Sequence, residues 1–400
     1  MLKTFVTLLA VLATLPGFSQ KTDRISVNNP GASRWNAIIT FPYTPASGTA
    51  NLCLIDSRNR KSYPLQILPT GEAVSIIDID AGERRIFQIK SRRPQASKAE
   101  IVEEEKQVRV LLNGKQIIGF QTGRGDLPEG VEPIYRRGGY IHPVLSPSGL
   151  QITDDYPQDH KHHHGVWAAW TKTSFQGRNP DFWNMAQNKG AVEFRALDHV
   201  QAGPVLAYIA AKNSYMDKTI LPHVEALKED FIVRAYNISG SQKRFYVFDI
   251  ELQQRCATQD QLILLSHIYG GIAFRGNGVW NGKEHAQFLT SGGKNRENGN
   301  ATNADWIRVS GQVAGKLAGV TILSHPSNFR APQPLRIHPK EPYISFAPSQ
   351  AGEFRIQPGE VYTARYRFIV YDGEADTGFI QGMWKDYSQP LKIEINLNHD

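Results

Sequence analysis

The clearest indication of the fold is the stretch Val108-Arg109-Val110-Leu111-Leu112-Asn113-Gly114-Lys115-Gln116-Ile117-Ile118. Two apolar runs flank Asn113-Gly114, a pair that tolerates the positive φ angles of a type I′ turn. Such a turn joins neighbouring antiparallel strands, so the sequence predicts a β-hairpin over these residues.

Further strands are expected on the C-terminal side of this hairpin, because short runs of β-branched and aromatic residues alternate with Gly and Pro turns. Strands do not alternate with long amphipathic helices, which argues against a parallel α/β fold. We therefore expect an all-β protein dominated by a large antiparallel β-sandwich. Its predicted strands include residues 192–197, 205–211, 223–236, 244–255, 263–274, 318–324 and 362–371.

On the N-terminal side, the spacing of strands and turns predicts a small β-sandwich module over residues 25–95. A polar segment that contains Pro94, residues 91–105, is expected to link it to a large domain over 105–390. The strands predicted for the small module are 35–43, 51–56, 73–79 and 85–91.

The first nineteen residues are typical of a secretory signal: Lys3, a short apolar run, and small residues before a cleavage site preceding Gln20. No later stretch is long and apolar enough for a membrane-spanning helix. The sequence thus predicts a periplasmic or extracellular protein without membrane insertion. Cys53 and Cys256 are too few for a disulfide scaffold; Cys53 suits a buried free thiol, and a disulfide between the two stays an alternative.

The charge balance disfavours nucleic acid as a partner. The 400 residues carry a formal net charge of +7, and the strongest local run, Glu103-Glu104-Glu105, is acidic. A nucleic-acid-binding surface needs clustered Lys and Arg, and the sequence has no such cluster.

The predicted strand 244–255 has one apolar and one polar face by period-two alternation. Asp249, Glu251, Gln253 and Arg255 share the polar face. This face either meets solvent or lines a cleft, where its carboxylates would suit hydroxyl recognition or proton transfer.

The chemistry is expected to centre on Asp159-His160-Lys161-His162-His163-His164-Gly165. If this segment is extended, His160, His162 and His164 share one side and His163 faces the other. Imidazole passes protons near neutral pH and binds metals, and nearby Asp side chains could orient the rings. Three interpretations stay open: a proton-transfer or hydroxyl-binding site, a metal site, and a surface loop. The spacing matches no standard metal motif.

Aromatic and basic residues in other motifs could complete such a site. Trp167, Trp170 and Trp183 either stack on a sugar ring or fill the core. Gly-rich turns and loops elsewhere add imidazole and guanidinium groups at Arg136, His142, Arg275, His325 and Arg330.

Several of these segments together resemble the secreted bacterial family DUF6807, also labelled methane oxygenase PmoA, over roughly residues 105–375. The motifs are His142-Pro143-Val144-Leu145-Ser146-Pro147-Ser148-Gly149, Thr153-Asp154-Asp155, the histidine segment, Phe182-Trp183, Tyr269-Gly270-Gly271, Gly319-Val320, His325-Pro326-Ser327-Asn328, Tyr366-Arg367 and Asp372-Gly373. The resemblance implies a fold similar to the galactose-mutarotase-like supersandwich, whose concave face binds sugars. It also implies histidines at His160, His162 and His163, whereas His164 falls at a variable position that is often Arg.

The leading hypothesis is a secreted carbohydrate-active enzyme, such as a hydrolase, lyase or epimerase, acting on a saccharide or glycan. Two alternatives are a non-catalytic glycan-binding protein and a metal-dependent oxidoreductase. No cofactor is firmly implied, although a divalent metal at the histidines stays open, and no oligomeric state is predicted. The expected acid–base residues are His160, His162, His163, Asp155 and His325. The expected binding residues are Arg136, His142, Trp167, Trp170, Trp183, Glu251, Arg275 and Arg330.

Overall fold

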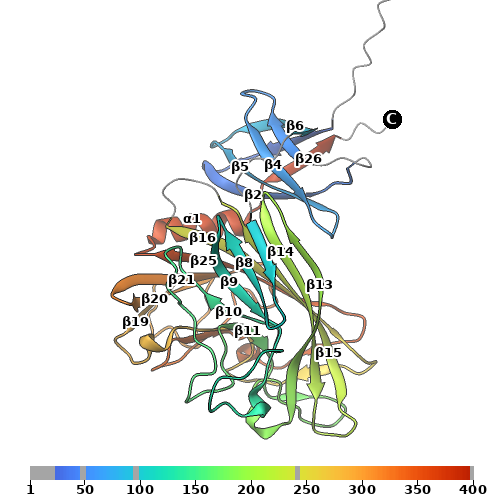
Figure 1. Cartoon of the computed structure of the whole chain (residues 1–400), viewed down its shortest axis with the longest axis vertical. Coiled ribbons are helices and arrows are strands. Elements are labelled where there is room, and N and C mark those ends of the chain that lie inside the picture. Colours follow the sequence, from blue (N-terminus) through green and yellow to red (C-terminus); the bar gives the residue numbers. More distant parts are fainter. Residues whose placement is uncertain (1–22, 46–50, 93–98, 239–243, 397–400) are drawn as a thin grey trace, which may run out of the picture.

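The computed structural model describes residues 23–45, 51–92, 99–238 and 244–396, so the predicted signal segment lies outside the described residues. These residues form an almost entirely β-stranded molecule, with a large sandwich at one end and a smaller sheet at the other (Figure 1). All strand pairs in the described ranges are antiparallel, which confirms the predicted all-β class. Four 3-10 turns interrupt the loops: Pro133–Tyr135, Met185–Gln187, Gly278–Trp280 and Pro348–Ala351.

One layer of the sandwich, here called the short-strand sheet, contains the predicted hairpin. Asn113 and Gly114 have φ angles of 53° and 72°, as a type I′ turn requires, and Leu112 pairs with Lys115. In spatial order the sheet contains β22 (Leu335–Ile337), β23 (Tyr343–Phe346), β18 (Gly271–Arg275), β11 (Val166–Ala169), β10 (Tyr140–Val144), β9 (Lys115–Gln121), β8 (Gln107–Leu112) and β7 (Ala99–Glu103).

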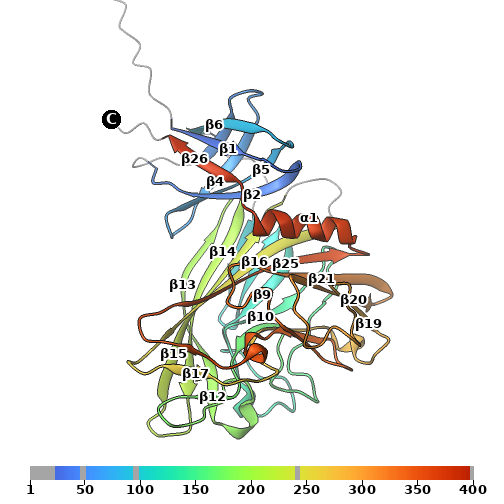
Figure 2. The ribbon, with the colours of Figure 1, turned by 180° about the vertical axis from the view of Figure 1, so that it is seen from behind.

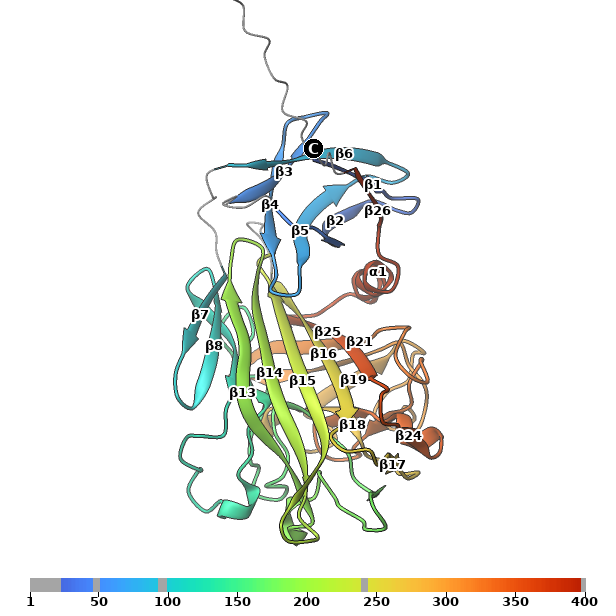
Figure 3. The same ribbon diagram turned by 90° about the vertical axis from the view of Figure 1, so that its right-hand side faces the viewer.

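The opposite layer, the long-strand sheet, contains the longest strands among the described residues, and Figure 3 shows them side by side. In spatial order it contains β13 (Gly190–Ala202), β14 (Leu206–Asp217), β15 (Val224–Tyr236), β16 (Phe245–Cys256), β25 (Tyr362–Asp372), β21 (Lys316–Ser324), β20 (Trp306–Val313) and β19 (Ala286–Thr290). Six of the seven strands predicted C-terminal to the hairpin correspond to strands here.

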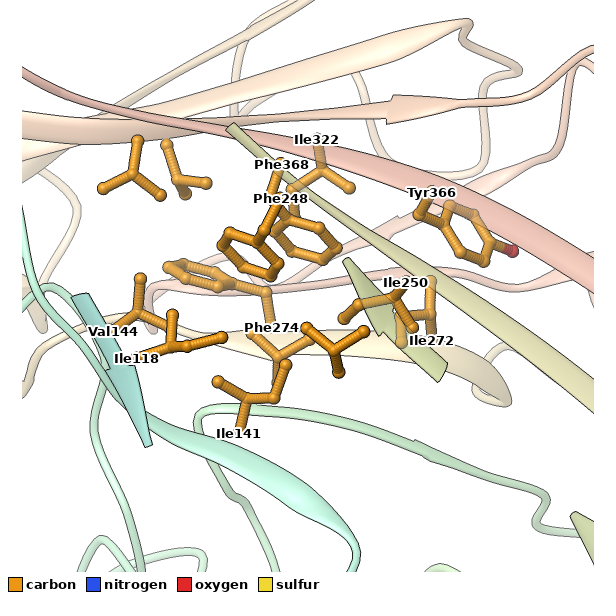
Figure 4. Packing of buried hydrophobic residues seen from close by; sticks show 14 of the residues in the cluster. Ile118, Ile141, Val144, Phe248, Ile250, Ile272, Phe274, Ile322, Tyr366 and Phe368 are labelled. Atoms are coloured by element: carbon orange, nitrogen blue, oxygen red, sulfur yellow. The ribbon is translucent and has the colours of Figure 1, made fainter. Parts of the chain in front are cut away.

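The main hydrophobic core fills the space between these two sheets (Figure 4). Ile118 and Ile141 come from the short-strand sheet, and Phe248 and Phe368 come from the long-strand sheet. The two phenylalanine rings stack with their centroids 4.7 Å apart. Because side chains alternate along a strand, each sheet also has a second face that points away from this core.

The smaller sheet forms from both ends of the chain, as Figure 2 shows. Its seventh strand, β26, pairs with β1 in the register Arg24 to Asn396, so the C-terminus completes the N-terminal module. The sequence did not predict this pairing. The spatial order is β2 (Arg34–Pro42), β5 (Glu72–Ile79), β4 (Ser62–Ile67), β3 (Leu52–Asp56), β6 (Arg84–Ser91), β1 (Arg24–Asn28) and β26 (Lys392–Asn396), and these strands surround a core of their own.

A single α-helix among the described residues, α1 (Thr377–Ser388), lies between the small sheet and the long-strand sheet (Figures 2 and 3). Asp376 caps it by accepting a hydrogen bond from the backbone N–H of Phe379 at 3.0 Å. Phe379, Ile380 and Met383 lie on one side of the helix and pack against the outer face of the long-strand sheet.

Two sequence-based expectations are wrong. Residues 263–274 are not one strand, because strand pairing ends at Leu264 and resumes at Gly271, where two glycines with positive φ angles, Gly270 and Gly271, turn the chain into another sheet. The first half becomes β17 (Leu262–Leu264), which forms a separate three-stranded sheet with β12 (Thr173–Ser174) and β24 (Phe354–Ile356). The second half becomes β18. The expected linker 91–105 contains β7, which pairs with β8 at the edge of the sandwich.

Within the described ranges, neither cysteine is bonded to the other: Cys53 is a buried free thiol, as predicted, and Cys256 is a partly buried one. The helices of the described residues include none with the length and apolarity that crossing a bilayer requires.

Candidate functional site

The histidine segment lies over the outer face of the short-strand sheet. Alternation along β11 directs Val166 and Ala168 into the main core and Trp167 to the opposite side. Arg275 of β18 and Tyr343 of β23 follow the same alternation, and both are fully buried. The loop that precedes β11 covers these three side chains, so the imidazoles of the histidine segment pack on buried aromatic rings and a buried guanidinium.

The segment folds as two successive turns, so the arrangement that an extended segment would give does not apply. The backbone N–H of His160 donates to the carbonyl of Pro157 at 2.9 Å, and that of His163 donates to the carbonyl of His160 at 2.7 Å. The second turn brings its first and last residues together, so the rings of His160 and His163 stack with centroids 4.7 Å apart. The ring of His164, and not that of His163, points away from the other histidines of the segment.

Four imidazoles therefore form one cluster, here called the histidine cluster: His160, His162, His163 and His338. His162 lies 4.6 Å from His163, and His338 lies 6.2 Å from His160, as measured between ring centroids. The His163 ring also stacks on Tyr343 at 5.0 Å. The side chain of His160 is 32 % exposed, so the cluster reaches solvent at one edge.

A buried ion pair lies directly beside this cluster. The Arg275 guanidinium donates to the carboxylate of Glu341 and, at 3.0 Å, to Asn281 Oδ1. The Nδ1 atom of His160 lies 3.2 Å from Glu341 Oε1, but the two are not aligned for a hydrogen bond. One potential ligand atom from each of His160, His163 and Glu341 lies within 4.8 Å of the other two, so these three residues could hold a metal ion.

Three imidazoles of the cluster, those of His162, His163 and His338, are held in their neutral form. Burial, with the neighbouring His160, lowers the pKa of His162 to about 4. Burial, followed by the charge of Arg336, lowers the pKa of His338 to about 4 as well. Burial and the neighbouring His162 lower the pKa of His163 well below its ordinary value. Neutral imidazoles accept hydrogen bonds, take up protons and bind metals.

Asp155 belongs to a separate buried network and does not orient the cluster. Its carboxylate accepts a hydrogen bond from Tyr140 Oη at 2.8 Å and lies 2.7 Å from His164 Nδ1. Burial raises the pKa of Asp155 to about 6. Asp159 is the carboxylate beside the cluster, with Oδ2 3.3 Å from His160 Nδ1. His142 lies near this network, and its Nδ1 atom shares a hydrogen bond with Thr153 Oγ1 at 3.0 Å.

The three predicted tryptophans are buried and offer no open ring face to a ligand. Trp167 is covered by His163, whose ring centroid lies 5.5 Å away. Trp170 donates through Nε1 to Gln254 Oε1 at 2.7 Å inside a secondary core. Trp183 packs on Trp167 at 5.3 Å. The partly exposed ring in this region is Tyr269, on which the Arg336 guanidinium rests at 5.1 Å.

His325 and Glu251 lie on the other side of the molecule, on the outer face of the long-strand sheet. Both line a hollow of about 650 Å³ between this sheet, the small sheet and α1. Asp249 and Gln253 line it too, which confirms the interpretation that the polar face of strand 244–255 borders a cleft. The main core separates this hollow from the histidine cluster.

Arg136 and Arg330 have structural roles away from both places. Arg136 is exposed and donates to the carbonyls of Gly123 and Gly125. Arg330 donates to three backbone carbonyls, including that of Pro348 at 2.8 Å. Their guanidinium groups therefore stabilise loops.

The sequence did not point to Glu341, His338, Tyr343 or Arg336 as candidates. The stretch His338-Pro339-Lys340-Glu341-Pro342 contains a signal, because it places an imidazole and a carboxylate in a Pro-bounded loop. That loop joins β22 to β23, and the backbone N–H of Glu341 donates to His338 Nδ1 at 3.0 Å.

Comparison with known proteins adds a family and a set of distant likenesses. A model of the family DUF6807, described as a family of unknown function, matches residues 107–385. No curated protein matches the sequence.

The similar solved structures include enzymes that act on carbohydrates. An alpha-mannosidase from Enterococcus faecalis is 10% identical over 96% of this chain and 47% of that chain, with a TM-score of 0.49, so this chain spans about half its length. A heparan sulfate lyase from Pedobacter heparinus is 10% identical over 72% of this chain and 38% of that one, with a TM-score of 0.32. A galactose mutarotase related enzyme from Lactobacillus acidophilus is 8% identical over 70% of this chain and 98% of that one, with a TM-score of 0.32. Likenesses at this level say nothing about the activity of this chain.

Proposed function

We propose that this chain, which belongs to the DUF6807 family, is an exported carbohydrate-active enzyme whose reacting centre is the histidine cluster. The observation that carries this proposal is the convergence of four imidazoles with the Glu341–Arg275 pair at a solvent-reachable edge. These groups come from two loops and from strand β18, which are far apart in the sequence, and the fold brings them to one place. Histidines and carboxylates gathered in this way suit proton transfer to and from hydroxyl groups.

The surroundings of the cluster fit a saccharide. Sugars present apolar C–H faces and polar hydroxyl edges, and Tyr269 offers a partly exposed ring within 5.8 Å of Tyr343, which underlies His163. Arg336 contributes a guanidinium that also donates to Tyr269 Oη at 3.1 Å. In this proposal Tyr269 and Arg336 hold the sugar, and His162, which is partly exposed and packs on His163, transfers the proton.

Replacing His162 and His163 together by Ala is expected to lower turnover by at least about 100-fold, the lower range of what a positioned acid or base contributes. The measurement is product release, by mass spectrometry, from xylan, mannan, laminarin, pectin, heparan sulfate and starch. The matched control is His199→Ala, because the His199 side chain is 53% exposed and lies away from the cluster. A double variant that folds, as circular dichroism reports, and retains full turnover would refute the assignment.

A second candidate function, glycan binding without catalysis, is favoured by the hollow on the opposite face. Its charges are paired inside it: Asp249 accepts two hydrogen bonds from Arg367, at 2.7 and 2.8 Å, and Glu251 lies 3.3 Å from Arg365. Burial acts to raise the pKa of Glu251, but the hydrogen bond from Gln253 and the nearby arginines lower it, so the carboxylate stays ionised near neutral pH. Donors and acceptors in balance suit a neutral polyhydroxylated ligand.

Trp35 provides the test of this second candidate, since it borders the hollow and is 66% exposed. Trp35→Ala is expected to weaken the binding of a neutral oligosaccharide about tenfold, because one stacking contact is removed. The control is Leu221→Ala, another exposed apolar side chain, on a distant loop. Calorimetric titration with xylohexaose, mannohexaose, laminarihexaose and cellohexaose measures the change, and equal affinities for both variants would count against the hollow.

A further inference from the structure

We propose that His160, His163 and Glu341 bind one divalent transition-metal ion, of the class of Zn²⁺ or Fe²⁺, with a coordination position left open. This inference goes beyond the proposed function and does not depend on it, because metal binding is measured without turnover. Two imidazoles and one carboxylate form a ligand set that both ions use in open sites.

The distances within this trio suit a shared ion. Ligand atoms at 2.0–2.2 Å from a tetrahedral Zn²⁺ lie about 3.4 Å from one another. His160 Nδ1 and Glu341 Oε1 are already 3.2 Å apart without the alignment of a hydrogen bond. All three ligand atoms lie within 4.8 Å, so binding needs an approach of at most about 1.4 Å. It also needs the His160 ring to turn out of its stack on His163, so that both nitrogens point at the ion, and the partly exposed His160 side chain can make this movement.

A second observation points to a ligand at the same place. His163 is 4% exposed, and its Nδ1 atom has no hydrogen-bond partner within the described ranges. A buried polar atom without a partner costs about 1–3 kcal/mol, so such atoms are rare unless something else satisfies them. A bound cation would satisfy this nitrogen and that of His160 together.

Neighbouring side chains also hold the Glu341 carboxylate in place and contribute negative charge to the site. Arg275 and Asn281 hold Glu341 as outer partners hold the ligands of metal sites. Two carboxylates lie near the positive charge of Arg275. One is that of Glu341, and the other is that of Asp159, whose Oδ1 lies 3.9 Å from Arg275 Nη2. These two carboxylates outnumber Arg275 by one negative charge, and the charge of Arg336, which acts on His338, is the cation that opposes an incoming ion.

Calorimetric titration of the full chain with ZnCl₂ tests this site. The chain carries no histidine tag and is stripped with EDTA, and we expect one Zn²⁺ per chain. His160→Ala and His163→Ala should each weaken binding at least about 100-fold, since loss of an outer partner alone costs 10–100-fold. His199→Ala, the exposed control, should bind as the unmodified chain does. Co²⁺ should show the absorption bands of a tetrahedral or five-coordinate ion, and these bands should vanish in both cluster variants.

Absence of binding to the unmodified chain, or undiminished binding to His160→Ala, overturns the proposal. His160→Ala decides the matter if His163→Ala fails to fold, because the His160 side chain is partly exposed. A chain that turns over a saccharide but binds no Zn²⁺ refutes the metal site alone. A chain that binds Zn²⁺ at this site but acts on no saccharide refutes the proposed enzyme alone.

Discussion

Arg275→Met is expected to lower the free energy of unfolding by about 3–5 kcal/mol, the usual cost of leaving one partner of a buried ion pair without the other. Arg275 is fully buried and the side chain of Glu341 is 10% exposed, so water cannot replace the lost guanidinium. The methionine side chain keeps most of the volume, which separates the electrostatic effect from a cavity effect. Chemical denaturation followed by tryptophan fluorescence measures the change.

The double variant Arg275→Met with Glu341→Gln isolates this cause. Removing both charges leaves no buried ion without a counter-charge, so the double variant should recover at least half of the lost stability. The surface pair of Arg58 and Glu83 is the matched control, because Arg58 is 77% exposed and Arg58→Met should change stability by less than about 1 kcal/mol. A double variant less stable than Arg275→Met would show that the pair is not the source of the effect.

The sequence predicted those parts of the fold that local rules determine. The type I′ turn at Asn113-Gly114 needs only two residues with positive φ, and the hairpin follows from them. The alternation along β16 likewise identified the face with Asp249 and Glu251, because period two is a property of any strand. Neither prediction required knowledge of what the strand packs against.

The arrangement of the site depended on contacts between distant residues, which one sequence does not contain. His325 and the histidine segment both looked like parts of one site, yet they lie on the outer faces of opposite sheets. Glu341 faces His160 because β23 pairs with β18 and β18 with β11, a register set by packing. Within the segment, Pro157 and Asp159 favour turns, and this local signal could have predicted that His160 and His163 meet.

The two outer faces impose different requirements on a ligand, and this difference separates the two candidate functions. The histidine cluster lies over a floor of buried rings and a buried ion pair, so its groups are fixed and suit chemistry on one bound unit. The hollow lies between two sheets and α1, and its charges are already paired. A long glycan that occupied the hollow could not reach the cluster without passing around the edge of the sandwich, so the two sites should bind independently.

Gly165→Ala should be among the most destabilising single changes in the chain, by about 3 kcal/mol, because the new methyl group meets backbone. A Cβ atom at Gly165 would lie 2.3 Å from the carbonyl oxygen of Ile141 and 3.1 Å from the Cβ of His142. The carbonyl of Gly165 also accepts a hydrogen bond from the backbone N–H of Arg275 at 2.8 Å. Any shift that relieves the clash therefore moves β11 away from β10 and displaces both the histidine segment and Arg275.

Gly382→Ala in α1 is the matched control and should change stability in the opposite direction. A Cβ atom at Gly382 meets nothing within 4 Å, and alanine in a helix is favoured over glycine by about 0.5–1 kcal/mol. Thermal denaturation of the two variants should thus give midpoints on opposite sides of that of the unmodified chain. A neutral Gly165→Ala would mean that β10 and β11 do not approach as closely as described, and the placement of His160 and His163 beside Glu341 would then lose its support.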